Sequence, residues 1–169
     1  MTYILGQIFG LLGAVGVVVS LQMKKKWQIL AVSVFVNICG AVNILLLDQF
    51  NSGVLLNLLA CLQIGITTWH DHKKITVPVW EKLIFLALYV TLGIVGYARP
   101  LDLLSILAAV FYMCSVFQKK EQNVRLFLLG NMTTWAVYHA ILGSTSLIAQ
   151  LAGIASSLIA LWRYKKTKR

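Results

Sequence analysis

The chain has 169 residues, of which 59% are hydrophobic and 12% are charged. Designed soluble surfaces carry charge at roughly a quarter to a third of their positions, so this composition excludes an ordinary soluble domain and predicts that much of the chain faces lipid. The net charge of +10 would suit a nucleic-acid partner. The basic residues, however, fall between apolar runs, so we expect the lipid bilayer as a partner and no nucleic acid.

Seven apolar segments follow one another along the chain. They are Thr2–Met23, Trp27–Leu47, Gly53–Trp69, Val79–Tyr97, Pro100–Phe117, Val124–Leu142 and Leu147–Arg163. Each approaches the ~17–25 residues that an α-helix needs to cross a bilayer, and the alternation typical of a β-barrel is absent. The sequence therefore predicts an all-α polytopic membrane protein with seven transmembrane helices and no separate soluble domain.

The three cysteines, Cys39, Cys61 and Cys114, lie far apart, and each lies within an apolar run. A zinc site or a disulfide framework would need closely spaced ligands or paired cysteines. We therefore interpret the cysteines as small packing residues in helices.

Lysine and arginine are distributed unevenly between alternate connections. Of the 15 basic residues, 14 lie in the connections after the first, third and fifth segments and in the tail, whereas Arg99 alone lies at the other end. Cytoplasmic loops of membrane proteins are enriched in Lys and Arg. The split therefore predicts an outside N-terminus and a cytoplasmic C-terminus, and it supports the count of seven because one missed helix would destroy it.

The first and last thirds of the chain resemble each other at an offset of 93 to 95 residues. The clearest pairs are Gln7 with Asp102, Asn37 with Asn131, Asn57 with Gln150, and Trp69 with Trp162. Because three is odd, two three-helix units of like orientation need one extra helix between them. We predict a first unit at 1–72, an inverting linker helix within 73–98, and a second unit at 99–169 that ends in the basic tail. In transporters built from parallel repeats, the substrate site lies near the midplane between the repeats.

The opening segment 6–13, the lysine-rich first connection and the helix that carries Asn131, Trp135 and His139 resemble the YgjV family of small bacterial inner-membrane proteins. This resemblance covers essentially the full chain and implies a multi-pass protein of the bacterial inner membrane. The plan of two three-helix units and a linker resembles that of the SWEET sugar transporters and of PnuC-type nicotinamide riboside transporters, which implies a transporter architecture.

The prolines depart from the pattern of SWEET-like and PQ-loop proteins, where proline, often in a Pro-Gln pair, lets helices bend. The comparable positions here read Leu21-Gln22 and Phe117-Gln118. The chain has two prolines, Pro78 and Pro100, and both lie at predicted helix ends. A symmetric proline hinge is therefore not predicted.

Polar side chains inside apolar segments are candidates for a binding site, because they are costly in lipid unless they face protein or water. In segment 124–142, Asn131, Trp135 and Tyr138 share one helical face, with His139 at its margin. Flat rings with a hydrogen-bonding edge beside an amide suit a neutral flat solute such as a nucleoside or vitamin ring, or a sugar. The alternative is that Asn131 bonds a neighbouring helix and the aromatic rings only pack.

The other predicted substrate-binding residues are amides in further segments. Asn37 lies on the corresponding face of its segment, and Asn57 and Gln150 lie about one and a half turns from the outer ends of theirs. We expect Asn57 and Gln150 either to hold a ligand or to close the outer mouth by bonding each other, with plain interhelical bonding as the alternative. Asn43 is interpreted as a residue that bonds a neighbouring helix.

The favoured function is a small-solute transporter. Facilitated diffusion is expected because no acidic residue lies in the middle of a segment and His139 is the one residue there that titrates near neutral pH. The alternative is a non-transporting inner-membrane scaffold or lipid-binding protein. The spacing of Gly6 and Gly10 favours packing within the first unit but also allows a homo-oligomer.

An enzyme is not expected, and neither is a cofactor or a metal. His70-Asp71-His72 forms the one cluster that suggests a metal, but it lies at a helix end without further ligands nearby. No pattern of a nucleophile with its base occurs.

Overall fold

The computed structural model describes residues 1–22, 26–75, 77–117 and 121–167, with side chains for 1–19, 31–70, 72–75, 77–115, 123 and 126–159. These residues form seven α-helices and no β-strand, which confirms the predicted all-α class. The helices are α1 (Thr2–Gln22), α2 (Lys26–Leu47), α3 (Ser52–Lys73), α4 (Val79–Val95), α5 (Asp102–Phe117), α6 (Glu121–Leu142) and α7 (Ser146–Thr167). Each predicted apolar segment corresponds to one helix.

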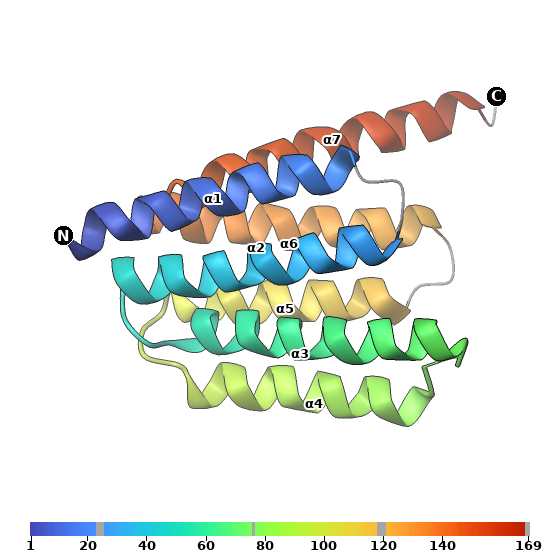
Figure 1. Ribbon diagram of the computed structural model, residues 1–169, viewed down its shortest axis with the longest axis horizontal. Coiled ribbons are helices and arrows are strands. Elements are labelled where there is room, and N and C mark those ends of the chain that lie inside the picture. The colour runs from blue at the N-terminus through green and yellow to red at the C-terminus, as the bar shows by residue number, and fades with distance from the viewer. Residues whose placement is uncertain (23–25, 76, 118–120, 168–169) are drawn as a thin grey trace.

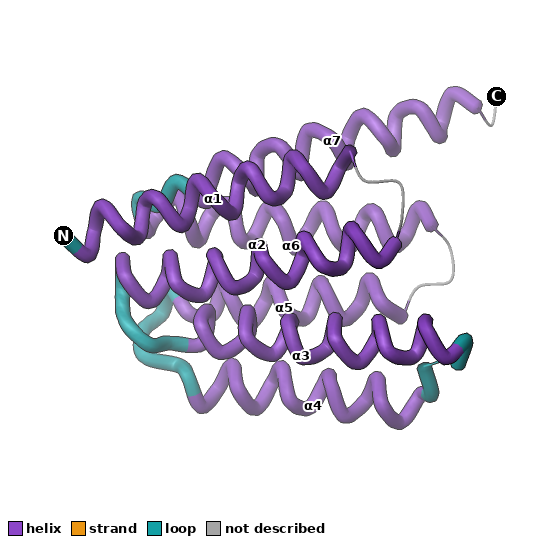
Figure 2. Tube along the Cα trace, in the orientation of Figure 1, coloured by secondary structure: helices purple, strands orange, loops and turns teal. Residues whose placement is uncertain are grey.

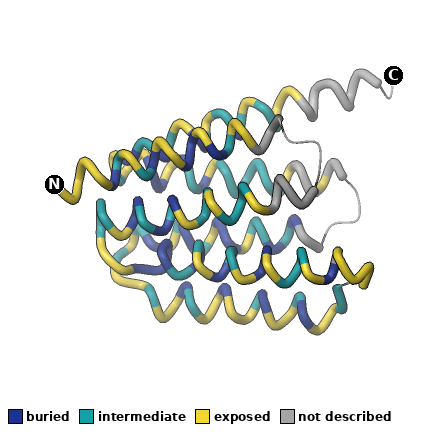
Figure 3. The backbone as a smooth tube through the Cα atoms, viewed as in Figure 1, coloured by how far each residue is buried: buried dark blue, intermediate teal, exposed yellow. Residues whose placement is uncertain are grey.

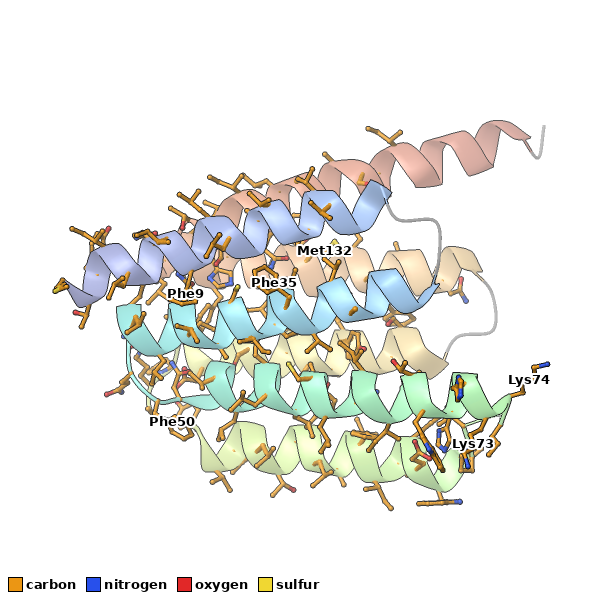
Figure 4. The ribbon with its side chains drawn as sticks, viewed as in Figure 1. Phe9, Phe35, Phe50, Lys73, Lys74 and Met132 are labelled. Atoms are coloured by element: carbon orange, nitrogen blue, oxygen red, sulfur yellow. The ribbon has the colours of Figure 1, made fainter. Side chains whose placement is uncertain are left out.

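The helices lie side by side and alternate in direction along the long axis of the molecule (Figure 1). The loops gather at the two ends of this bundle (Figure 2). One end carries the N-terminus, Phe50 and the connections that contain Asp48, Arg99 and Ser144; we call it the Arg99 end (Figures 1 and 4). The opposite end carries Lys73 and Lys74, and we call it the lysine end (Figure 4).

Six helices form a closed ring. In the order α1, α2, α3, α5, α6 and α7, each helix packs against the next, and α7 packs against α1. Helix α4 lies outside this ring, at one edge of the bundle, and packs against α3 and α5 (Figure 1). The centre of the ring is therefore enclosed by helices from both halves of the chain.

The outward faces of the helices are apolar. Exposed positions recur along α1, α3 and α4 (Figure 3), and they include large side chains such as Val15 and Ile94, which are 60% and 64% exposed. Two stretches, Thr2–Val19 and Ser52–His70, are long and apolar enough to cross a membrane, and α2, α5, α6 and α7 contain shorter apolar stretches of 10–17 residues. Exposed apolar surface on this scale is typical of a protein in contact with lipid.

Glycines let α1 approach its neighbours closely. A Cβ atom on Gly6 would come within 2.8 Å of Leu47, and one on Gly16 within 2.7 Å of Val36, both on α2. A Cβ atom on Gly10 would instead collide with Thr145 at the start of α7. The predicted packing within the first three helices is thus confirmed for Gly6, and Gly16 packs in the same way. Gly10 approaches both halves of the chain, because its Cβ atom would also come within 3.0 Å of Asn43 on α2.

The His70-Asp71-His72 cluster at the end of α3, where no metal site is predicted, lies near a carboxylate that sequence reasoning overlooked. His70 Nδ1 lies 3.5 Å from Glu81 Oε1 in the first turn of α4, so the expectation of no nearby acidic residue was wrong at this point. His72 is exposed, and the side chain of Asp71 lies outside the described residues. Among the described residues, no group of three His, Cys, Asp or Glu side chains could hold a metal ion.

Candidate functional site

A cavity of about 350 Å³ lies inside the bundle and is lined by residues from all seven helices. Its volume falls within the ~300–1,000 Å³ range of small-molecule sites. Its side chains with hydrogen-bonding groups are Ser33, Asn37, Asn57, Tyr89, Tyr112, Asn131, Trp135, His139, Ser146 and Gln150. None of the described residues that line it is Asp, Glu, Lys or Arg, so the cavity places hydrogen-bonding groups within a mostly apolar wall and carries no fixed charge.

Six of the seven residues predicted to bind a substrate line this one cavity. They are Asn37, Asn57, Asn131, Trp135, His139 and Gln150. These residues come from α2, α3, α6 and α7, so the fold brings together side chains that lie up to a hundred or so positions apart in the sequence.

The cavity amides bond to backbone carbonyl groups and not to one another. Asn37 Nδ2 donates to Ser33 O at 2.7 Å, and Asn57 Nδ2 donates to Gly53 O at 2.8 Å, so both bonds stay within one helix. Among the described side chains, no bond joins Asn57 to Gln150. The amide pair that could have closed the outer mouth is therefore not formed.

Asn131 makes the interhelical contact that was considered as its alternative role. Its Nδ2 donates to Ala108 O at 2.8 Å, which joins α6 to α5. Asn131 also lines the cavity, so its bond to α5 does not remove it from the candidate site.

An aromatic pair on α6 forms part of the cavity wall. The rings of Trp135 and His139 stack with centroids 5.6 Å apart and planes inclined by 24°. His139 is 4% exposed, and its Nδ1 atom is buried without a hydrogen-bond partner among the described residues. An unpaired buried nitrogen is costly, so this ring offers a hydrogen-bonding position that a ligand could satisfy.

Tyr138, the seventh predicted residue, does not line the cavity. It is fully buried, its ring contacts Trp135 edge to face at 5.4 Å, and its hydroxyl accepts a hydrogen bond from Asn51 Nδ2 at 3.1 Å. That bond gives the Tyr138 hydroxyl a partner within the protein. Tyr138 therefore packs against Trp135 and does not face the cavity.

Tyr89 and Tyr112 line the cavity, although neither was predicted to do so. Their rings meet edge to face at 6.1 Å, and Tyr89 donates to Gln63 Oε1 at 2.8 Å. The signal that could have found Tyr89 was a hydroxyl in the middle of the apolar stretch 83–95, which it shares with Thr91. Because the sequence predicts this helix to be a linker, none of its residues is among the predicted site residues.

Charged and polar groups join the connections at the Arg99 end. The Arg99 guanidinium forms an ion pair with Asp48, which is also bonded by Asn51 Nδ2 at 2.8 Å. Burial raises the pKa of the Asp48 carboxyl, while the charge of Arg99 acts in the opposite direction. Nearby, the hydroxyls of Ser52 and Ser105 lie 2.6 Å apart and join α3 to α5.

Asp102 lies in the first turn of α5, and its side chain bonds to the backbone just before the helix. Its Oδ2 atom accepts hydrogen bonds from the backbone N–H groups of Ala98 at 2.8 Å and Arg99 at 3.0 Å, which precede the helix. The carboxylate therefore holds the turn that positions Arg99 beside Asp48.

A second group of bonds at the Arg99 end holds the start of α7. Gln7 Nε2 donates to Gly143 O at 2.7 Å, and Gln7 Oε1 accepts from the Thr145 N–H at 2.8 Å. Asn43 Oδ1 accepts from Ser144 Oγ at 2.7 Å, which confirms the interhelical role predicted for Asn43. We call these bonds, with Asp48–Arg99, Asn51–Tyr138 and Ser52–Ser105, the Arg99-end seam; each joins residues 7–52 to residues 99–146.

Comparison with known proteins places the chain in a family. A family model described as a bacterial inner membrane protein, Imp-YgjV, matches residues 4–168. No curated protein and no solved structure matches the chain, so the likeness to SWEET and PnuC-type transporters stays a prediction. Because the family model covers nearly the whole chain, the protein belongs to the Imp-YgjV family of bacterial inner membrane proteins.

Proposed function

We propose that this protein is a facilitative transporter for a small, neutral, polar solute that binds in the central cavity. The observation that carries the proposal is the cavity itself: hydrogen-bonding side chains stand in its mostly apolar wall, it holds no fixed charge among the described residues, and helices from both halves of the chain line it. Polar side chains within a membrane protein cost free energy unless they contact water, a ligand or another polar group.

The proposed architecture is two parallel three-helix units, 1–72 and 99–169, joined by α4. The helix lengths support it, since α2 and α6 each have 22 residues, as do α3 and α7. The packing supports it too, because the α1–α7 contact corresponds to the α5–α3 contact under exchange of the units, and α4 stays outside the ring. The cavity then lies on the axis that relates the units, as in other transporters with parallel repeats.

All seven helices cross the inner membrane in this proposal, with the N-terminus outside and the C-terminus in the cytoplasm. The helices have 16 to 22 residues, which at 1.5 Å per residue corresponds to about 24–33 Å, close to the thickness of the hydrocarbon core. The lysine end carries Lys73 and Lys74, and α1 and α5 end there, directly before the stretches that are lysine-rich in the sequence. In the proposal this end therefore faces the cytoplasm.

Facilitated diffusion is proposed because the cavity provides no carboxylate for coupling to Na⁺ or H⁺ among its described residues. The test is uptake by liposomes that contain the purified full chain, with radiolabelled nucleosides, vitamins and neutral sugars. We expect one class of solute to equilibrate faster than in protein-free liposomes and not to accumulate when a pH or Na⁺ gradient is imposed. Accumulation that depends on a gradient would refute the facilitative mechanism, and no uptake of any solute would refute transport.

The second candidate is a non-transporting scaffold or lipid-binding protein, and the bond from Asn131 to Ala108 O favours it because that bond holds α6 on α5. Under this alternative, Asn131→Ala lowers the stability of the protein and changes no flux. Under the transport proposal the same substitution lowers both. Measuring thermal unfolding and uptake on one preparation separates the two functions.

A further inference from the structure

The amide groups that line the cavity have a fixed orientation. In Asn37, Asn57 and Asn131 the amide nitrogen lies beside the carbonyl oxygen of a backbone peptide. A backbone carbonyl can only accept a hydrogen bond, so the group next to it must be the NH₂ of the amide. The surroundings therefore distinguish nitrogen from oxygen in all three side chains.

This orientation leaves the three amide oxygens for a ligand. Among the described residues, none donates a hydrogen bond to Oδ1 of Asn37, Asn57 or Asn131. The Oδ1 atom of Asn57 lies over Gly40 of α2, where a Cβ atom would come within 3.1 Å, so the absence of a side chain at Gly40 keeps this oxygen uncovered. The oxygens belong to α2, α3 and α6, and each has two lone pairs.

Two hydroxyl donors of the cavity are already engaged. Tyr89 donates to Gln63 Oε1, and Ser146 Oγ donates to Asn43 Oδ1 at 3.1 Å. The N–H groups of Trp135 and Gln150 make no hydrogen bond to another described side chain, so they add donors on α6 and α7. The open acceptors of the asparagines therefore lie on α2, α3 and α6, whereas the open side-chain donors, which also include the Tyr112 hydroxyl, lie on α5, α6 and α7.

The lack of positively charged side chains in the described lining also restricts which solutes can bind. A carboxylate or phosphate in this cavity would leave water for a site with uncovered carbonyl oxygens and no Lys or Arg among the described lining residues. Burial of an unpaired anion is strongly unfavourable. An amino group on a flat ring, in contrast, would satisfy the oxygens, and the stacked rings of Trp135 and His139 provide an aromatic wall beside it.

Building on the transport function proposed above, we infer that the cavity selects flat heterocyclic solutes with an exocyclic amino group over solutes of the same shape with an exocyclic carbonyl group, and that it excludes carboxylates and phosphates. Selectivity arises because an exocyclic carbonyl oxygen placed against the asparagine Oδ1 atoms cannot donate a hydrogen bond to them, so these acceptors stay unpaired. The Oδ1 atoms of Asn37, Asn57 and Asn131 determine this specificity.

The experiment compares matched pairs on the purified full chain in detergent. Cytidine with uridine and adenosine with inosine exchange an amino group for a carbonyl oxygen and turn the neighbouring ring nitrogen from an acceptor into an N–H donor, and cytidine with cytidine monophosphate adds a phosphate. Dissociation constants follow from the ligand-dependent rise in unfolding temperature. We expect the amino member of each pair to bind about tenfold more tightly than the carbonyl member, and the phosphate to abolish binding.

Substitution of a single asparagine tests the assignment. In Asn37→Leu the acceptor is lost without breaking an interhelical bond, because its amide bonds within α2, and we expect the ratio of cytidine to uridine affinity to fall towards one. Asn57→Ala serves the same purpose if the first variant does not fold. The matched control is Thr133→Val, an exposed residue whose hydroxyl bonds within α6 and whose loss should leave the ratio unchanged.

The outcomes separate this inference from the function on which it rests. Equal binding of both members, or tighter binding of the carbonyl member, refutes the inference and leaves transport in place. The same holds if no nucleoside binds while a neutral sugar is taken up in the liposome assay. If no solute binds or is taken up, both the inference and the transport function are wrong.

Discussion

Two neighbouring aromatic residues of α6 have different tasks, although the sequence predicted one task for both. Trp135 lines the cavity, whereas Tyr138 is fully buried and bonded to Asn51. We therefore expect Trp135→Ala to weaken solute binding at least tenfold through loss of the stacking surface. Tyr138→Phe keeps the ring and loses one hydrogen bond, so it should lower the free energy of unfolding by about 0.5–1.5 kcal/mol and leave affinity unchanged. Thermal unfolding with and without solute measures both quantities, and equal losses of affinity in the two variants would contradict the distinction.

At the scale of elements, the contact between α1 and α7 depends on the absence of a side chain at Gly10. A Cβ atom there would collide with Thr145 Oγ1 and come within 3.0 Å of the Ser146 backbone nitrogen. Gly10→Ala should therefore destabilise the protein by roughly 1–3 kcal/mol, as overpacking usually does. Gly65→Ala is the matched control, because nothing lies within 4 Å of its new Cβ atom and alanine favours the helix. Denaturant unfolding in detergent compares the two, and a Gly10→Ala protein as stable as Gly65→Ala would argue against the close approach.

At the scale of the whole molecule, the proposed orientation follows from the unequal charge of the two ends. Alkaline phosphatase is active only when it is exported, so its fusion after Ser144 at the Arg99 end should be active and its fusion after Lys74 at the lysine end should be inactive. Green fluorescent protein at the C-terminus should fluoresce. If the fusions after Ser144 and Lys74 report the same side of the membrane, the count of crossings is wrong.

The helices could be predicted closely because apolar length determines a helix in lipid, but their ends could not. The predicted segment Val124–Leu142 corresponds to α6, which begins at Glu121, because the backbone continues its hydrogen bonding into polar residues beyond the apolar stretch. Helical periodicity also predicted Asn131, Trp135 and His139 for one site. Periodicity could not predict that Tyr138 pairs with Asn51, since 87 positions separate them and no local pattern records such a contact.

The Arg99-end seam has a consequence for the direction from which a solute arrives. Its bonds fasten the early part of the chain to the late part on the side proposed to face the periplasm. Because these bonds lie side by side across one boundary, parting the boundary breaks them together. In the proposed transport cycle, the rate at which these bonds break together limits the rate at which a solute enters from the periplasm. This limit is independent of the affinity of the cavity for the solute.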